Sequence, residues 1–275
     1  YGFVKLYGLP GAVAQRVPPR SASGRGEMDV SASEPELSVV IPVFDEEGSL
    51  PGLQEAVDAA ARALTPHYEI VYVDDGSRDG SPAILDRFAA TLPQVRVIRL
   101  DRNHGLSSAL TVCFSAARGR LIGTLDADLQ NDPGDLAKLH DAIEAGADMA
   151  CGWRRDRDDP FVKRVSSKIA NGWRNWRTGA SIHDVTCPLK LFRREVRATF
   201  YPFNGLHRFL PMLAAMAGHT VVEIPVTHRK RAHGTSKYGV WNRVFKGLRD
   251  LRAIRWMQTT HMTYRAREVG REERP

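Results

Sequence analysis

The chain of 275 residues has an ordinary globular composition, with 43% hydrophobic residues, 26% charged residues and a net charge of +7. Its three cysteines, Cys113, Cys151 and Cys187, are far apart and fit neither a zinc motif nor a disulfide framework, which favours a reducing compartment. No apolar run approaches the roughly 20 residues that span a bilayer, so we expect the chain not to cross a membrane.

The first segment, residues 1–34, is rich in Gly, Ser, Pro and Arg and has no sustained hydrophobic period, which predicts a disordered leader. Met28 is a candidate start, and a transit peptide or a short amphipathic anchor is an alternative for this segment. We expect a folded domain over 35–258, with halves at 35–150 and 151–258, and a C-terminal tail over 259–275.

Three strand–helix units open the folded domain. The expected strands are apolar and rich in β-branched residues, and the expected helices have apolar residues at helical spacing. The strands are predicted at 37–43, 68–73, 95–100 and 121–125, and the helices at 50–64, 82–92 and 106–117. Ser49 is expected to cap the first helix. Successive β-α units predict an α/β fold with a mostly parallel central sheet and flanking helices.

The fourth expected strand ends in two carboxylates, Asp126 and Asp128. Their i, i+2 spacing puts both on one side of an extended chain, and Gln130 follows at the same spacing. In open α/β sheets ligands bind outside the carboxyl ends of the strands. Two acids there suit a hard divalent cation, Mg²⁺ or Mn²⁺, which shares its coordination with substrate phosphates. A solvated Asp-x-Asp turn is the alternative for this motif taken alone.

Acidic residues also follow the first two expected strands, Glu46 after the first and Asp75 after the second. Because the carboxyl ends of parallel strands share one edge, we expect these acids to join Asp126 and Asp128 there. The sequence contains no Gly-x-Gly-x-x-Gly or Gly-Lys-Ser/Thr loop, which argues against dinucleotide redox enzymes and P-loop ATPases. An acidic rim would bind a nucleoside diphosphate through a metal, and its carboxylates can accept base N–H groups and ribose hydroxyls.

The two halves of the domain differ in charge. Between Cys151 and Thr260 there are 22 Lys and Arg residues against 7 Asp and Glu, an excess of +15, so the rest of the chain carries −8. A basic half suits nucleic acid, anionic lipid or a phosphorylated substrate. No RNA-binding strand signature or clear helix-turn-helix accompanies it, so we expect no nucleic-acid partner.

Five segments in order resemble the signatures of family 2 glycosyltransferases of the GT-A fold. They are VIPVFDEE at 40–47, VDDGS at 73–77, LDADLQ at 125–130, GWR at 152–154 and RAHGTSKY at 231–238. The last two resemble the polyprenyl-phosphate branch, which includes dolichyl-phosphate mannosyltransferase and bacterial undecaprenyl-phosphate sugar transferases. The resemblance runs from about Leu37 to Met257.

The resemblance implies a division of roles among the residues. The donor nucleotide would be held by Pro42, Phe44, Glu46, Val73, Asp75, Asp126 and Ala127. The metal and the diphosphate would be held by Asp126, Asp128 and Gln130. Catalysis would rest on Asp128 together with three residues that contact phosphates, Arg154, Arg231 and Lys237.

The chain departs from the family's pattern at two places. Phe44 stands where Tyr is commoner, and DVTC at 184–187 lacks the usual Asp-Thr-Gly-Cys form, so no role is assigned to Asp184. The Gln-x-x-Arg-Trp signature of processive polysaccharide synthases is not present, because Arg252 stands at the position of the Gln before Arg255-Trp256.

The resulting hypothesis is a metal-dependent inverting transfer of a sugar from GDP-mannose or a UDP-hexose to a polyprenyl phosphate. A polyprenyl phosphate is already ionised near neutral pH, so it needs no general base. The alternatives are a GT-A transferase that acts on a hydroxyl acceptor, building a polysaccharide or glycolipid, and a sugar nucleotidyltransferase. A catalytically dead adaptor and a nucleic-acid-binding protein are weaker readings.

Two amphipathic stretches, 161–177 and 240–257, combine aromatic stripes with basic residues. Such stretches are typical of interfacial helices, which predicts a peripheral protein on an anionic membrane, at its cytoplasmic face. A solvated basic face over a stripe packed on the sheet is the alternative. His207, Arg208 and His228 are candidates to meet the lipid phosphate, and a separate membrane protein is a possible partner.

Overall fold

The computed structural model describes residues 34–155 and 182–229. The predicted leader up to residue 33, both amphipathic stretches, the tail, and the segment that contains Arg231 and Lys237 lie outside the described residues. The described elements, in chain order, are β1 (Leu37–Val43), α1 (Leu50–Leu64), β2 (Tyr68–Asp74), α2 (Ser81–Thr91), β3 (Val95–Arg99), α3 (Leu106–Ala116), β4 (Leu121–Thr124), η1 (Pro133–Asp135), α4 (Leu136–Glu144), β5 (Met149–Trp153), β6 (Lys190–Arg193), η2 (Arg194–Thr199), η3 (Leu206–Arg208), α6 (Leu210–Met216) and β7 (Val221–Pro225). The seven elements predicted from β1 to β4 are confirmed to within one residue at each end.

These strands form one sheet in the order β3-β2-β1-β4-β6-β5-β7. β1 pairs in parallel with β2 and β4, β2 pairs in parallel with β3, and β5 pairs in parallel with β7. β6 runs antiparallel to both β4 and β5. The predicted α/β class with a mostly parallel sheet is therefore confirmed, and the reversed β6 begins at the edge where β4 and β5 end.

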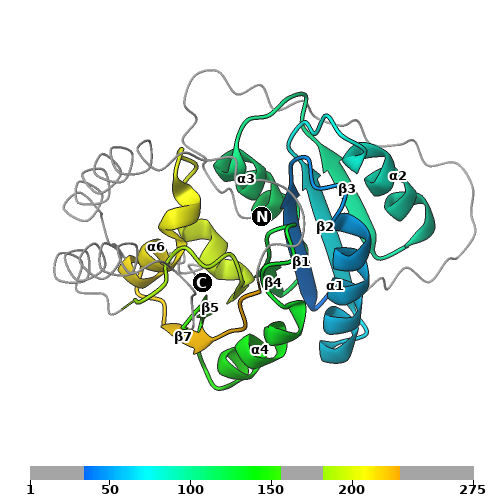
Figure 1. The fold of residues 1–275 in the computed structure, drawn as a ribbon. Coiled ribbons are helices and arrows are strands. Elements are labelled where there is room, and N and C mark those ends of the chain that lie inside the picture. Colours follow the sequence, from blue (N-terminus) through cyan, green and yellow to red (C-terminus); the bar gives the residue numbers. More distant parts are fainter. Residues whose placement is uncertain (1–33, 156–181, 230–275) are drawn as a thin grey trace, which may run out of the picture. The chain divides into compact units, whose positions relative to one another are not determined.

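Alternation along the central strands supplies a core on each face of the sheet. Val39 and Ile41 of β1 pack in the same cluster as the buried residues of α1 and α4, whereas Val40 packs in the cluster of α3 and α6. All seven residues of β1 are buried, as expected for a strand covered on both faces. In Figure 1, β1 and β2 lie between α1 and α3. The carboxyl ends of β1, β2 and β4 are thus held at one edge by helices on both sides.

Candidate functional site

The loops after β1 and β2 are tied together at the carboxyl edge of the sheet. The Asp45 N–H donates to Ser77 Oγ (3.0 Å), Asp45 Oδ1 accepts the Arg78 N–H (2.7 Å), and the Glu46 N–H donates to Ser81 Oγ (2.9 Å). Asp45 has φ = 52°, a left-handed conformation that is uncommon for a residue other than glycine. Glu46 and Phe44, the predicted nucleoside contacts, are half-buried within this double loop.

Other predicted nucleoside residues are more deeply placed. Pro42 and Val73 are buried and face each other in the β1–β2 register. Asp75 is 3% exposed, and its two carboxylate oxygens accept the backbone N–H groups of His104 (2.7 Å) and Gly105 (2.9 Å). Asp75 therefore holds the β3–α3 loop at the same edge.

The acidic loop, residues 125–132, follows β4 at this edge. Asp126 and Asp128 are half-buried, whereas Ala127 between them is buried. Asp128 Oδ1 accepts the Gln130 N–H (3.1 Å). Leu129 has φ = 56°, and its side chain packs against the apolar core shared by α1 and α4. A left-handed leucine is strained, and such strain persists only where the surrounding contacts impose it.

The charges of several predicted site residues affect the pKa of Asp126. The pKa of Asp126 is raised to about 6, first by burial and then by the neighbouring charges of Asp128 and Glu46, against the opposing charges of Lys190 and Arg154. Asp126 accepts no hydrogen bond from any residue in the described ranges. The structure thus brings Glu46, Asp126 and Asp128 within electrostatic reach of one another.

This donor set fits a hard divalent cation. Carboxylates that repel each other favour an ion that neutralises both, and Mg²⁺ and Mn²⁺ take carboxylate and amide oxygens. Within 34–155 and 182–229, no three His, Cys, Asp or Glu side chains are grouped so as to hold a metal by themselves. Such an ion would therefore need oxygens from a bound phosphate, which is how Mg²⁺ is commonly held at phosphate sites.

Arg154, predicted to contact phosphates, is held by Asp184. Arg154 Nε donates to Asp184 Oδ2 (2.7 Å), its Nη2 donates to Oδ1 (3.0 Å), and the same Nη2 donates to Thr186 Oγ1 (3.0 Å). Glu223 of β7 in turn accepts the Asp184 N–H (2.7 Å). The sequence analysis assigned no role to Asp184, because DVTC departs from the family's pattern, and the pair joins residues 30 positions apart.

Lys190 is a site residue that sequence reasoning missed. It begins β6, is only 2% exposed, and donates from Nζ to the carbonyl of Cys187. Its register partner in β4 is Thr124, two residues before Asp126. The available signal was a lone lysine inside the apolar run Leu189–Phe192, since a buried lysine needs a specific partner.

The chain after β7 returns to the acidic loop. His228 forms an isolated antiparallel bridge with Asn131, the Arg229 N–H donates to Gln130 O (2.8 Å), and the Arg229 guanidinium pairs with Asp132. Arg231 and Lys237 follow outside the described residues, so their predicted roles stay predictions.

His207, a candidate for the lipid phosphate, lies in η3 and contacts Ser107 at the start of α3. Its Nδ1 is 3.0 Å from Ser107 Oγ, which also accepts the Gly205 N–H (2.9 Å). Burial lowers the pKa of His207 to about 4, with the charges of Arg208 and Lys190 acting in the same direction. His207 is therefore neutral at pH 7.

The N-terminus of α1 lacks the predicted side-chain cap. Ser49 occupies the N-cap position of α1, but its hydroxyl accepts no N–H of that helix, so the expected side-chain cap is wrong.

Among the helices within the described residues, none is long and apolar enough to span a bilayer.

Comparison with known proteins places this geometry in a family. Residues 38–200 match the family model "Glycosyl transferase family 2". The undecaprenyl-phosphate 4-deoxy-4-formamido-L-arabinose transferase of Aeromonas hydrophila subsp. hydrophila is 38% identical over 205 residues, which are 74% of this chain and 63% of that protein. The dodecaprenyl-phosphate galacturonate synthase of Rhizobium johnstonii is 36% identical over 237 residues, 84% of this chain and 69% of that protein.

The fold also matches solved glycosyltransferase structures of the GT-A type. Glucosyl-3-phosphoglycerate synthase from Mycobacterium tuberculosis, in complex with Mn²⁺, uridine diphosphate and phosphoglyceric acid, superposes with a TM-score of 0.60 at 16% identity, over 85% of this chain and 81% of that one. At that identity the likeness concerns the fold. The chain spans a little under two thirds of the length of the Aeromonas relative. On the family match and the two prenyl-phosphate relatives, the chain belongs to glycosyl transferase family 2.

Proposed function

We propose that this protein transfers a sugar from a nucleotide-sugar donor, GDP-mannose or a UDP-hexose, to a polyprenyl phosphate. The observation that carries the proposal is the placement of the loops of Glu46, Asp126 and Asp128 at the carboxyl edge of the sheet, where Ser49 Oγ lies 3.3 Å from Glu46 Oε2 and 2.7 Å from the Ala127 carbonyl between the two aspartates. The names of the relatives, which are undecaprenyl- and dodecaprenyl-phosphate enzymes, support the acceptor class.

Donor binding is assigned to the carboxyl edge. The half-buried Glu46 offers a carboxylate to base or ribose donors, whereas Asp75 acts indirectly by holding the His104–Gly105 backbone. Asp126, Asp128 and Gln130 would hold Mg²⁺ or Mn²⁺, which when bound neutralises the charge of the donor diphosphate. The Mn²⁺ in the structurally similar synthase supports this choice of metal class.

The reaction needs little proton chemistry from the protein. An oxygen of the ionised polyprenyl phosphate forms a bond to the anomeric carbon while the bond from that carbon to the donor diphosphate breaks, and the nucleoside diphosphate departs with the electron pair. The protein orients two anionic substrates and offsets the charge of the leaving group. The charges of Lys190 and Arg154 act on Asp126, and Asp184 holds Arg154 in place through an ion pair.

Incorporation of labelled sugar into solvent-extractable lipid tests the proposal. A thermal-shift screen of GDP- and UDP-sugars with Mn²⁺ selects the donor, and the labelled donor is then incubated with polyprenyl phosphate. We expect label in the lipid fraction and none in excess chelator. Label in a polysaccharide or in a hydroxyl glycolipid would overturn the acceptor assignment.

Membrane association is assigned to the basic half of the chain. We expect binding to anionic liposomes that weakens at high salt, because exposed charge attraction is screened. If the protein does not bind at low salt, the acceptor must be presented by another membrane protein.

We also assign the segment with Arg231 and Lys237 to the departing diphosphate. Removing one charge-stabilising donor costs about a hundredfold or more in turnover, which is the loss we expect for Arg231→Ala and Lys237→Ala on a short water-soluble prenyl phosphate. Normal turnover with lost liposome binding would reduce the segment to a lipid-attracting surface.

A further inference from the structure

Ser49 joins the two loops that carry the predicted donor and metal residues. It is 3% exposed, and its Oγ lies 2.7 Å from the carbonyl oxygen of Ala127, 3.0 Å from that of Glu46 and 3.3 Å from Glu46 Oε2. A hydroxyl has one proton to donate, and the shortest distance assigns it to Ala127. That carbonyl lies between Asp126 and Asp128 in the chain.

The local sequence explains why this serine does not cap its own helix. An N-cap side chain accepts the N–H of the second or third helical residue, and in α1 the second is Pro51, which has no N–H. Of the two N–H groups that usually bond to an N-cap side chain, one is therefore absent from α1. The hydroxyl is used instead for a contact with a residue 78 positions away.

The acidic loop needs such a restraint for two reasons. Asp126 and Asp128 are like charges two positions apart in the chain, and such charges repel each other. Leu129, directly after them, has a left-handed backbone. Repulsion and strain both favour a rearranged loop, and the Ser49 hydrogen bond at Ala127 opposes that rearrangement from between the two acids.

We propose that Ser49 is a positioning residue that fixes the Asp126–Asp128 pair relative to Glu46, a role that rests on the proposed function. It touches neither the donor nor the metal, and it acts through the Ala127 carbonyl. Loss of its hydroxyl frees the acidic loop and weakens divalent-cation binding before it affects the rest of the fold.

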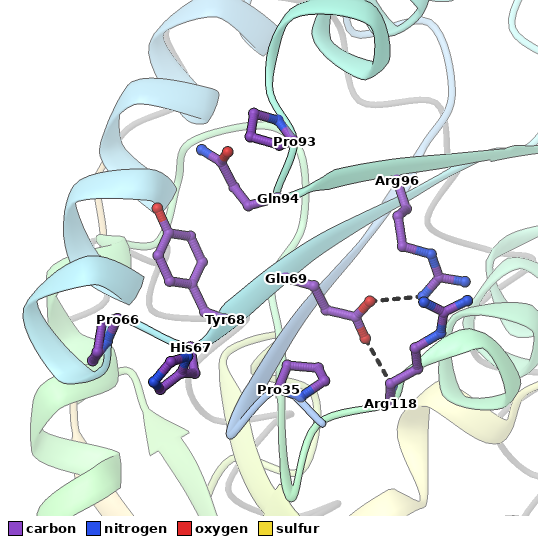
Figure 2. A pocket seen from close by; sticks show the side chains of 9 residues that line it. All are labelled: Pro35, Pro66, His67, Tyr68, Glu69, Pro93, Gln94, Arg96 and Arg118. Carbon is purple, nitrogen blue, oxygen red and sulfur yellow. Dashed lines mark hydrogen bonds and ion pairs between the residues drawn. The ribbon is translucent and has the colours of Figure 1, made fainter. Parts of the chain in front are cut away.

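The chain offers a matched control in Ser38, at the opposite edge of the same sheet. Ser38 is also fully buried, and its hydroxyl donates to Glu69 Oε1 (2.6 Å) and accepts the Gly119 N–H (2.7 Å). Glu69 lines the hollow in Figure 2, where its dashed contacts lead to Arg96 and Arg118. Ser38→Ala thus removes a buried serine hydroxyl far from the proposed site.

Two measurements on the full chain test Ser49→Ala against Ser38→Ala. Hydrogen–deuterium exchange of a peptide covering 125–131 reports the loop directly, and we expect roughly five- to tenfold faster exchange in Ser49→Ala only, the effect of losing one buried hydrogen bond. Titration of Mn²⁺ with UDP or GDP, followed by electron paramagnetic resonance, is expected to show about tenfold weaker binding, as when a supporting partner of a metal ligand is lost.

Ser49→Thr separates the hydroxyl from the volume of the side chain, because it keeps the donor and should restore both readouts. The proposal is overturned if loop exchange and Mn²⁺ half-saturation in Ser49→Ala change no more than in Ser38→Ala. A wild-type protein that transfers no sugar to polyprenyl phosphate would contradict the proposed function. The exchange comparison still decides the role of Ser49 in that case.

Discussion

Glu69 and Asp126 are acids at opposite edges of one sheet, and their surroundings differ in kind. Glu69, near the start of β2, is 6% exposed and is bonded to the Ser38 hydroxyl (2.6 Å), the Arg96 guanidinium (2.7 Å) and the Arg118 N–H (2.8 Å). Glu69 is among the residues that line a hollow of about 310 Å³, and these residues are drawn in Figure 2. Asp126, after β4, accepts no hydrogen bond from the described parts of the chain and has acidic neighbours.

The two carboxyl groups differ in pKa accordingly. Burial opposes the ionisation of Glu69, but the hydrogen bonds from Ser38, Arg96 and Arg118 outweigh it and lower the pKa. Burial and like charge raise the pKa of Asp126 to about 6. A buried acid whose partners are all supplied by the protein serves the fold, whereas one with acidic neighbours and no hydrogen-bond donor among the described residues is suited to a cationic ligand.

The largest effect is expected from Asp128→Ala. This change removes half of the carboxylate pair and should abolish sugar transfer and sharply weaken Mn²⁺-dependent binding of the nucleoside diphosphate. The free energy of unfolding without metal should not fall, because the like-charge repulsion on Asp126 is relieved. Transfer assays and Mn²⁺ titration measure the two sides of this prediction.

Two results would contradict the prediction for Asp128→Ala. One is full transfer activity in Asp128→Ala, and the other is full wild-type activity in excess chelator. A large loss of stability in the variant would show instead that Asp128 serves the fold, as Glu69 does.

Glu69→Gln should have the opposite profile. It removes the charge that Arg96 and the Arg118 N–H share, so we expect the free energy of unfolding to fall by about 2 kcal/mol, the scale of hydrogen bonds to a charged group. Turnover per folded molecule and Mn²⁺ binding should match the wild type. Chemical denaturation measures the free energy of unfolding. Weaker Mn²⁺ binding at unchanged stability would contradict the assignment of Glu69 to the fold.

The pH dependence of stability should also differ in sign between the edges. Because the pKa of Glu69 is lowered on folding, its contribution is present above the unfolded value of about 4.3 and is lost as the pH falls through the folded value. The stability deficit of Glu69→Gln should therefore shrink below about pH 4.

Asp126 has a raised pKa, so the folded state holds its proton longer than the unfolded chain does. Wild-type stability should decline relative to Asp126→Asn as the pH rises from about 4 through 6. The gain of Asp126→Asn at pH 7 should be on the order of 2 kcal/mol in metal-free buffer. Denaturant titrations of both variants between about pH 2.5 and 7.5 test the opposite slopes, and parallel slopes would refute them.

The sequence predicted what depends on local pattern. Apolar β-branched runs located β1 to β4, and the position of Asp126 and Asp128 after β4 located the candidate site. The reversed direction of β6 was not predicted, because strand direction within a sheet depends on long-range pairing. The Arg154–Asp184 pair, 30 positions apart, was not predicted for the same reason.

The roles of individual residues could be predicted only in part, because they depend on contacts with residues far along the chain. Ser49 has the sequence signature of a helix cap, and only the tertiary fold brings Ala127 to its hydroxyl. Asp75 was predicted to hold the nucleoside, and the structure adds its two bonds to the β3–α3 loop. Sequence spacing indicates which edge a side chain reaches, whereas the available partners there are set by segments far along the chain.

The smallest effects are expected at Asp135. Variants of this residue test whether a carboxylate serves the fold because of its bonding partners or binds metal because of its position near the acidic loop. Asp135 lies in η1, on the chain that leaves the acidic loop, yet its side chain is 7% exposed and fully engaged: Oδ2 accepts the Thr227 N–H (2.6 Å), and Oδ1 pairs with Lys138 (2.6 Å). If pairing decides, Asp135 belongs with Glu69. Asp135→Ala should then lower the free energy of unfolding by about 1 kcal/mol, and Asp135→Asn by less, because the amide oxygen still accepts the Thr227 N–H. Lys138→Ala should cost at most about 0.5 kcal/mol, since this lysine is exposed. Mn²⁺ half-saturation of the folded protein should stay at the wild-type value in all three variants. Weakened Mn²⁺ binding in Asp135→Asn at wild-type stability would instead show that nearness to the acidic loop, whatever the partners, recruits a carboxylate to the site.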